Sequence, residues 1–98
     1  MNKNINKPRH MAVYEAITSL ETVEECVKLF DDLLSIAELR AMEQRYQVAR
    51  MLDKGMVYSA ILEKTGASSA TISRVNRSLQ SGGEGYRTVF ERVGDQDE

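Results

Sequence analysis

The 98-residue sequence has one cysteine, one histidine, one proline and no tryptophan. Cys26 cannot form a disulfide within the chain, and its place on an apolar helical stripe predicts a buried packing role rather than a reactive thiol. With His10 as the sole histidine, one chain cannot assemble a Cys/His zinc cluster or a serine or cysteine triad. We therefore expect no enzyme, no metal site and no cofactor.

Long hydrophobic runs are also lacking. No run reaches eighteen apolar residues, and the polar N-terminus MNKNINKPRH lacks the apolar core of a signal peptide. A hydrophobic content of 42% with 29% charged residues is typical of a soluble globular protein. These features predict one small cytoplasmic domain without a membrane partner, of a size at which dimerisation would add useful core.

The spacing of apolar residues predicts six helices and an all-α fold. Thr22 with Glu25, and Ser35 with Glu38, are capping boxes that should begin the second and third helices. The expected helices cover residues 11–19, 23–34, 36–54, 57–65, 69–79 and 86–93, and residues 81–85 should be a flexible, glycine-rich connection. Residues 1–10 are expected to be a loose arm and 94–98 an acidic tail, flanking a domain over 11–93.

The first two predicted helices are short and carry wide apolar stripes, which should pack inward or against a second copy of the chain. The arm's basic residues can either contact DNA phosphates or belong to an inert leader. Side chains predicted to face inward in helices one to four include Val13, Val23, Cys26, Val27, Leu33, Ile36, Ala49, Ile61 and Leu62.

The stretch from Met56 to Gln80 has the pattern of a helix-turn-helix, with Gly66 at the turn and Ser68 or Ser69 capping the second helix. That helix should bury Ala67, Ile72, Val75 and Leu79. Small and polar residues on its other face suit entry into the DNA major groove. The candidate DNA contacts are Ser68, Ser69, Ala70, Thr71, Ser73, Asn76 and Arg77, with Ser68 and Arg77 on phosphates.

An ordinary antiparallel helix pair has the same spacing and also needs a glycine at its corner. Two departures keep that alternative open: Leu62 stands where alanine is usual for close helix crossing, and polar Thr65 precedes the glycine. The charge pattern favours DNA. Residues 12–34 carry six acids against Lys28, whereas residues 39–80 carry seven bases against three acids.

The segments EECVKLFDDL, QRYQVARML and TGASSATISRV resemble the YerC/YecD branch of the Trp repressor superfamily. The resemblance extends over residues 11–93. It implies an intertwined all-helical homodimer that binds double-stranded DNA. It also implies an effector pocket between the long third helix and the recognition helix.

Carried over residue by residue, the resemblance assigns effector-pocket roles to Ser35, Arg45, Arg74 and Ser78. The sequence departs from the Trp repressor at Val75, where that family member has glycine beside the bound ring. Added bulk there leaves less room for an indole, because close-packed sites do not absorb extra methyl groups freely. The expected effector is therefore an amino acid or related metabolite other than tryptophan.

Together these observations predict a sequence-specific transcription regulator, expected to be a repressor, that binds a symmetric operator as a dimer. The two half-sites should lie about one DNA turn, or roughly 34 Å, apart. The rival hypothesis is a protein interaction module that docks on the transcription machinery without reading DNA. Salt-dependent DNA binding would separate the two.

Overall fold

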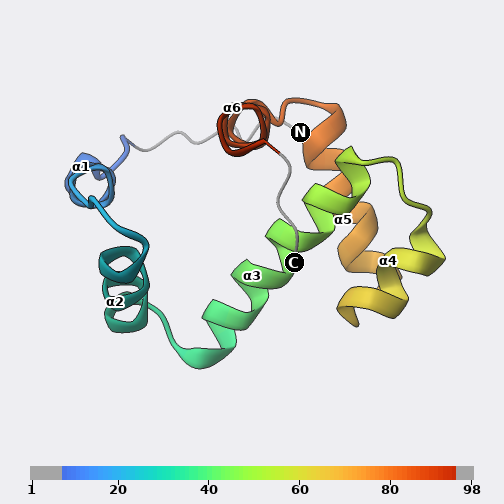
Figure 1. Ribbon diagram of the computed structural model, residues 1–98, viewed down its shortest axis with the longest axis horizontal. Coiled ribbons are helices and arrows are strands. Elements are labelled where there is room, and N and C mark those ends of the chain that lie inside the picture. The colour runs from blue at the N-terminus through green and yellow to red at the C-terminus, as the bar shows by residue number, and fades with distance from the viewer. Residues whose placement is uncertain (1–7, 95–98) are drawn as a thin grey trace. The chain divides into compact units, whose positions relative to one another are not determined.

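The computed structural model describes residues 8–94, in which six α-helices and no β-strand are found (Figure 1). The all-α prediction is confirmed. Most of the predicted arm and acidic tail, residues 1–7 and 95–98, lies outside the described residues. The helices are α1 (Met11–Thr18), α2 (Val23–Leu33), α3 (Ile36–Asp53), α4 (Tyr58–Thr65), α5 (Ser69–Gln80) and α6 (Glu84–Val93).

The chain divides within α3, between Ala41 and Met42, into two compact units. The N-terminal unit contains α1, α2 and the first residues of α3. The C-terminal unit contains the rest of α3 with α4, α5 and α6.

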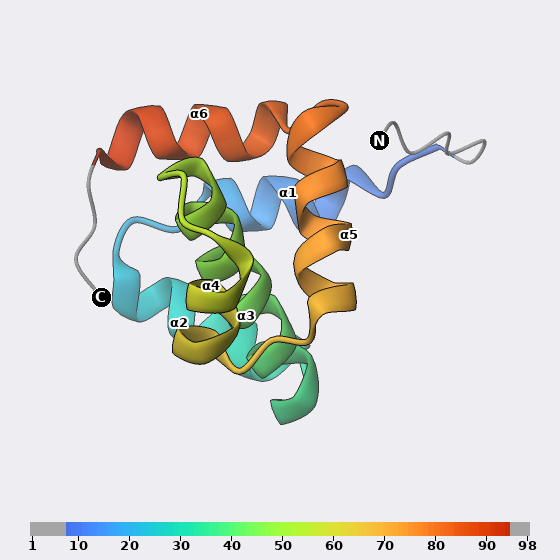
Figure 2. The same ribbon diagram turned by 90° about the vertical axis from the view of Figure 1, so that its right-hand side faces the viewer.

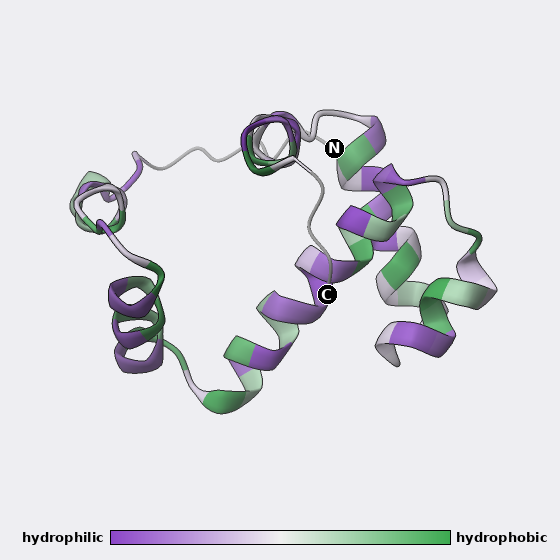
Figure 3. Ribbon diagram, in the orientation of Figure 1, coloured by the Kyte–Doolittle hydropathy of each residue, from purple (hydrophilic) through white to green (hydrophobic). Residues whose placement is uncertain are grey.

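The N-terminal unit buries none of the residues of α1 or α2. Val23 is 76% exposed, Val27 and Leu33 are each 52% exposed, and Cys26 is only half-buried. The prediction that these side chains, with Val13 and Ile36, are buried within the chain is wrong, because two short helices have too little surface to cover each other. Figure 3 shows α2 with a hydrophilic and a hydrophobic side.

In the N-terminal unit, side-chain hydrogen bonds stabilise the starts of α2 and α3, whereas α1 has no side-chain cap. The Thr22 hydroxyl accepts from the Glu25 amide at 3.1 Å, while the Glu25 carboxylate accepts from the amide of Glu21 at 2.8 Å. The reciprocal bond thus reaches one residue further back than the capping box predicts. At the start of α3 both predicted bonds form between Ser35 and Glu38.

The C-terminal unit has one hydrophobic core to which all four of its helices contribute. The burial of Ile61 and Ala49 is confirmed, as is that of the four predicted inward residues of the helix-turn-helix. Leu62 is 46% exposed, so its predicted inward position is wrong; adjacent helical residues point in different directions, and Ile61 takes the core side. The core residues are Val48, Ala49, Ile61, Ala67, Ile72, Val75, Leu79 and Phe90.

Arg50 is a buried cation that the apolar pattern of α3 did not reveal. It is 7% exposed, and its guanidinium carbon lies 4.6 Å from the centroid of the Phe90 ring, a cation–π contact. Tyr46 packs edge-on against the same ring at 5.7 Å, and Tyr86 stacks on it at 5.8 Å. Phe90 therefore fastens α6 to α3.

The last helix begins at Glu84, two residues earlier than predicted, so the connection after α5 is shorter than residues 81–85. Gly83 is its N-cap in the left-handed conformation, with φ of 68°. Glu84 then places a negative charge in the first turn, where the helix dipole favours it. The α5–α6 corner, residues 81–83, is a tight connection rather than the flexible segment expected.

The turn between α4 and α5 is closed by hydrogen bonds from Thr65. Its hydroxyl donates to the carbonyl oxygen of Ile61 at 2.7 Å and accepts from the amide of Ala67 at 3.1 Å. Gly66 follows with φ of 72°, and its amide bonds to the Leu62 carbonyl. The Gln44 side chain on α3 donates to the Thr65 carbonyl at 3.1 Å. The polar residue before the glycine is thus part of the turn itself.

We predict that Thr65→Val destabilises the protein by about 1–3 kcal/mol, because valine has the same shape but leaves the amide of buried Ala67 without its acceptor. Urea unfolding at a fixed protein concentration measures the effect. The matched control is Thr88→Val, since the hydroxyl of exposed Thr88 has no hydrogen bond to another described residue. Equal midpoints for the two variants would contradict the role assigned to Thr65.

Candidate nucleic-acid interface

The N-terminal end of α5 is fixed by its cap and presents small side chains outward. The Ser68 hydroxyl accepts from the Thr71 amide at 3.1 Å and contacts the Thr71 hydroxyl, also at 3.1 Å. Ser69 and Ala70 follow and are exposed. Small exposed residues at a helix N-terminus permit close approach of a ligand to the free backbone amides.

All seven predicted DNA contacts lie on or next to one helix, and they differ in how much of each side chain is available. Ser68 and Arg77 are exposed like Ser69 and Ala70, whereas Thr71, Ser73 and Asn76 are half-buried. The Thr71 hydroxyl accepts a hydrogen bond from the Ser68 cap, so it stabilises the start of α5 in addition to any contact with a ligand. Ile72, Val75 and Leu79 are buried and fix the orientation of the helix about its own axis.

The electrostatics of α5 favour an anion. The helix carries Arg74 and Arg77 and no acidic residue, and its first turn contains no acid that would offset the positive end of the helix dipole. Lys64 adds a positive charge in the last turn of α4, next to the turn. These groups suit a polyanion such as the DNA backbone.

Two of the four predicted effector residues are exposed arginines. Arg45 on α3 and Arg74 on α5 make no hydrogen bond or ion pair with any other residue of the described chain. Both guanidinium groups are therefore available to a carboxylate or phosphate. Sequence reasoning alone could not decide between this and pairing of Arg74 with an acid of the same chain.

Ser78 lines an open groove of ≈ 530 Å³ between α3, α5 and α6. Tyr46, Tyr86 and Val89 form its apolar walls, and neither Arg45 nor Arg74 lines it. Val75 is 3% exposed and belongs to the core, so it offers almost no surface as the floor of a pocket within this chain.

Ser35 lies in the N-terminal unit and caps α3. Its amide donates to the Glu38 carboxylate at 2.8 Å, and its hydroxyl accepts from the Glu38 amide at 3.2 Å. Hydrogen bonds from the Ser35 backbone and side chain lower the pKa of Glu38, because they stabilise the ionised carboxylate. The structure therefore gives Ser35 a capping role, which the sequence pattern had also indicated.

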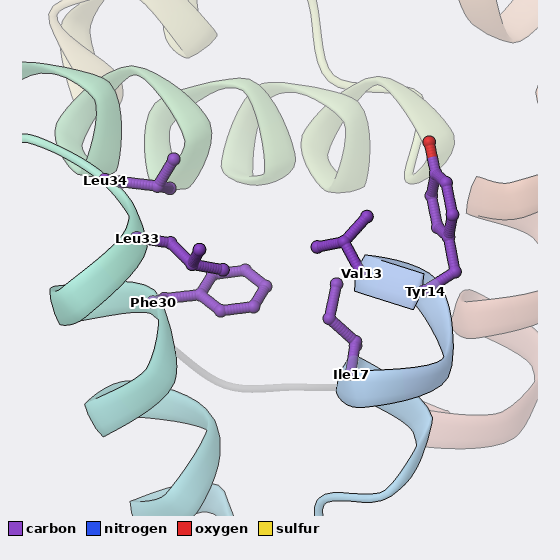
Figure 4. A pocket seen from close by; sticks show the side chains of 6 residues that line it. All are labelled: Val13, Tyr14, Ile17, Phe30, Leu33 and Leu34. Carbon is purple, nitrogen blue, oxygen red and sulfur yellow. The ribbon is translucent and has the colours of Figure 1, made fainter. Parts of the chain in front are cut away.

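A second groove, of ≈ 260 Å³, lies within the N-terminal unit and is almost entirely apolar. Figure 4 shows Val13 and Ile17 of α1 pointing toward Phe30 and Leu33 of α2, with Tyr14 and Leu34 at its edges. An uncovered apolar groove on helices without a buried residue suits the packing of another helical segment.

Residues 8–94 contain no group of three His, Cys, Asp or Glu side chains placed to hold a metal ion. Within the same range no helix has the length and apolarity needed to cross a membrane.

Comparison with known proteins agrees with the helical arrangement. The family model described as "Trp repressor protein" matches residues 9–94. The uncharacterized protein YerC of Bacillus subtilis (strain 168) is 47% identical over 81 residues, which cover 83% of this chain and 78% of YerC.

Two solved structures share both fold and sequence. A TrpR-like protein from Eubacterium eligens ATCC 27750 superposes with a TM-score of 0.82 at 48% identity, covering 88% of this chain and 89% of its own. A candidate Trp repressor from Staphylococcus aureus superposes with a TM-score of 0.81 at 43% identity, covering 88% and 86%. A family model that matches nearly the whole described chain, with relatives of this identity, shows that the chain belongs to the Trp repressor family.

Proposed function

We propose that the protein is a sequence-specific DNA-binding transcription repressor in which α5 reads the major groove. The observation that carries the proposal is the N-terminal half of α5: exposed Ser69 and Ala70 lead a helix that has two arginines and no acid. Membership of the Trp repressor family suggests the same class of function. The proposal includes a cytoplasmic location, together with the DNA, and no catalytic step.

The turn before α5 supports this use of the helix over an ordinary helix pair. Thr65, Gly66 and the Ser68 cap satisfy the polar groups of the turn, while Gln44 ties the turn to α3. A rigidly held helix end is needed if side chains are to meet base edges at fixed positions. The rival hypothesis, an interaction module that does not read DNA, is not favoured because it would need neither the cationic helix nor its small leading residues.

We predict that Arg77→Met weakens binding to all DNA sequences and lowers the salt slope by about one unit per phosphate contact in each subunit. Ser69→Ala should instead relax discrimination at particular base pairs, with the salt slope unchanged. Fluorescence anisotropy on a duplex selected from genomic fragments, and on random DNA, at several salt concentrations measures both effects. Arg92→Met, which removes the same charge from exposed Arg92 on α6, is the control. Wild-type binding by all three variants would exclude α5 as the reader.

We further propose that the active species is a homodimer, with two copies of α5 facing half-sites about one DNA turn apart. Helices α1 and α2 without a buried residue, and the apolar groove between them, support a second copy as the missing cover. A twofold-symmetric protein then matches a symmetric operator.

The dimer proposal predicts that sedimentation at micromolar concentration gives twice the chain mass of 11.1 kDa. Leu33→Glu should dissociate the dimer, because it places a charge in the apolar groove. The unfolding transition of this variant should be less cooperative than that of wild type. Lys28→Glu, at an exposed polar position of the same helix, should leave the dimer intact. A stable, folded wild-type monomer would refute the proposal.

An effector is the last element of the proposal: an amino acid or related metabolite other than tryptophan, whose carboxylate binds Arg45 and Arg74. Neither guanidinium group has a hydrogen-bond or ion-pair partner among residues 8–94, which supports a carboxylate ligand. Arg74→Met should weaken its binding by about 1.5–3 kcal/mol in calorimetric titrations with the twenty amino acids. Tight tryptophan binding by wild type would contradict the choice of ligand, and no binding at all would indicate a regulator without an effector.

A further inference from the structure

The α5–α6 corner is packed directly against the last turn of α5. The Ser81 amide and hydroxyl both donate to the Arg77 carbonyl, at 3.0 and 2.9 Å. A Cβ atom at Gly83 would lie 3.0 Å from the Leu79 carbonyl oxygen and 3.1 Å from the Leu79 Cα. Only glycine fits this contact at a positive φ, so the corner fixes where α5 ends (Figure 2).

Arg87 reaches back from the first turns of α6 to the carboxyl end of α5. Its Nη2 donates to the Leu79 carbonyl oxygen at 2.7 Å, and its Nη1 donates to the Gly82 carbonyl oxygen. A single planar guanidinium thus binds both the last turn of α5 and the corner. Charged donors bind such carbonyls more strongly than neutral ones do.

The position of Arg87 is unfavourable for its own helix. A cation close to the N-terminus of α6 faces the positive end of that helix dipole, while the same cation at the carboxyl end of α5 meets the negative end. The favourable electrostatic interaction of Arg87 is therefore with α5 and not with its own helix. Because Phe90 holds α6 to Tyr46 and Arg50 of α3, Arg87 connects α5 to an already anchored helix.

We propose that Arg87 is a positioning residue that sets the direction of α5 and thereby the half-site spacing that the repressor prefers. The inference rests on the proposed function, in which α5 reads DNA as one of two copies. A helix of twelve residues is roughly 18 Å long, so a tilt of about 10° at its carboxyl end moves its reading end by roughly 3 Å. That displacement is close to one base-pair step.

The test on DNA is a selection from duplexes in which the half-site separation varies by single base pairs. Wild type and the charge control Arg92→Met should enrich one separation. Arg87→Met should enrich the same half-site sequence, since residues 69–73 are unchanged, but its preference for the best separation over its neighbours should fall roughly three- to tenfold, because the expected displacement is about one base-pair step. Arg87→Met that keeps the wild-type spacing preference would overturn the inference.

A measurement without DNA separates the inference from the proposed function. Residual dipolar couplings of the ¹⁵N-labelled protein report the direction of α5 relative to residues 48–53 of α3. Arg87→Met should change the couplings of α5 while Arg92→Met leaves them as in wild type; unchanged couplings in Arg87→Met would overturn the positioning role. Altered couplings, together with no sequence enriched by wild type, would uphold the positioning role and overturn the reading of DNA. If Arg87→Met does not fold, Arg87→Lys, which keeps the charge but not the planar pair of donors, replaces it in both measurements.

Discussion

The helix-turn-helix depends on hydrogen bonds to the polar groups of the turn between the end of α4 and the start of α5. The Thr65 hydroxyl acts as both a donor and an acceptor there, and Ser68 caps α5. A hydrogen bond from Gln44 to the Thr65 carbonyl connects the turn to α3. Gly66 is required for its backbone angle alone, since nothing lies within 4 Å of a Cβ placed on it. With these bonds in place, Ile72, Val75 and Leu79 can all enter the core, and the remaining face of α5 is left to a ligand.

The two units of the chain have contrasting energetics. The C-terminal unit has a core of its own, extended by Arg50 and the aromatic rings around Phe90. In the N-terminal unit, side chains cap the starts of α2 and α3 but not that of α1, and neither α1 nor α2 has a buried side chain. Local hydrogen bonds therefore define where α2 and α3 begin, while the apolar faces of α1 and α2 are uncovered within the unit. This contrast is the physical basis for assigning DNA contact to the former and dimer contact to the latter. The segregation of acids and bases along the sequence follows the same division.

Helix positions and the core face of α5 could be predicted from sequence, because apolar spacing and capping residues are local signals. Burial in the N-terminal half could not be predicted. Val23 and Val27 have the spacing of a buried helix face, but α1 and α2 do not cover that face. The start of α6 was missed because glycines at 83 and 85 indicate a loop, whereas the structure uses one as a cap and tolerates the other inside the first turn. Arg50 and Gln44 make long-range contacts, and Arg87 bonds back across the corner to the end of α5; the periodicity of apolar residues encodes none of these contacts. Among the candidate site residues, exposure agrees with expectation for Ser69, Ala70 and Arg77, and Thr71 has a second role in the cap.

We infer that the N-terminal half of α5 is the surface that meets DNA. Amide chemical shifts of the ¹⁵N-labelled protein, followed as a selected duplex is added, test it residue by residue. We expect the largest shifts at residues 68–77, with α1 and α2 changing little. Shifts concentrated on the exposed face of α4, around Tyr58 and Leu62, or on α1 and α2, with residues 68–73 unaffected, would contradict it.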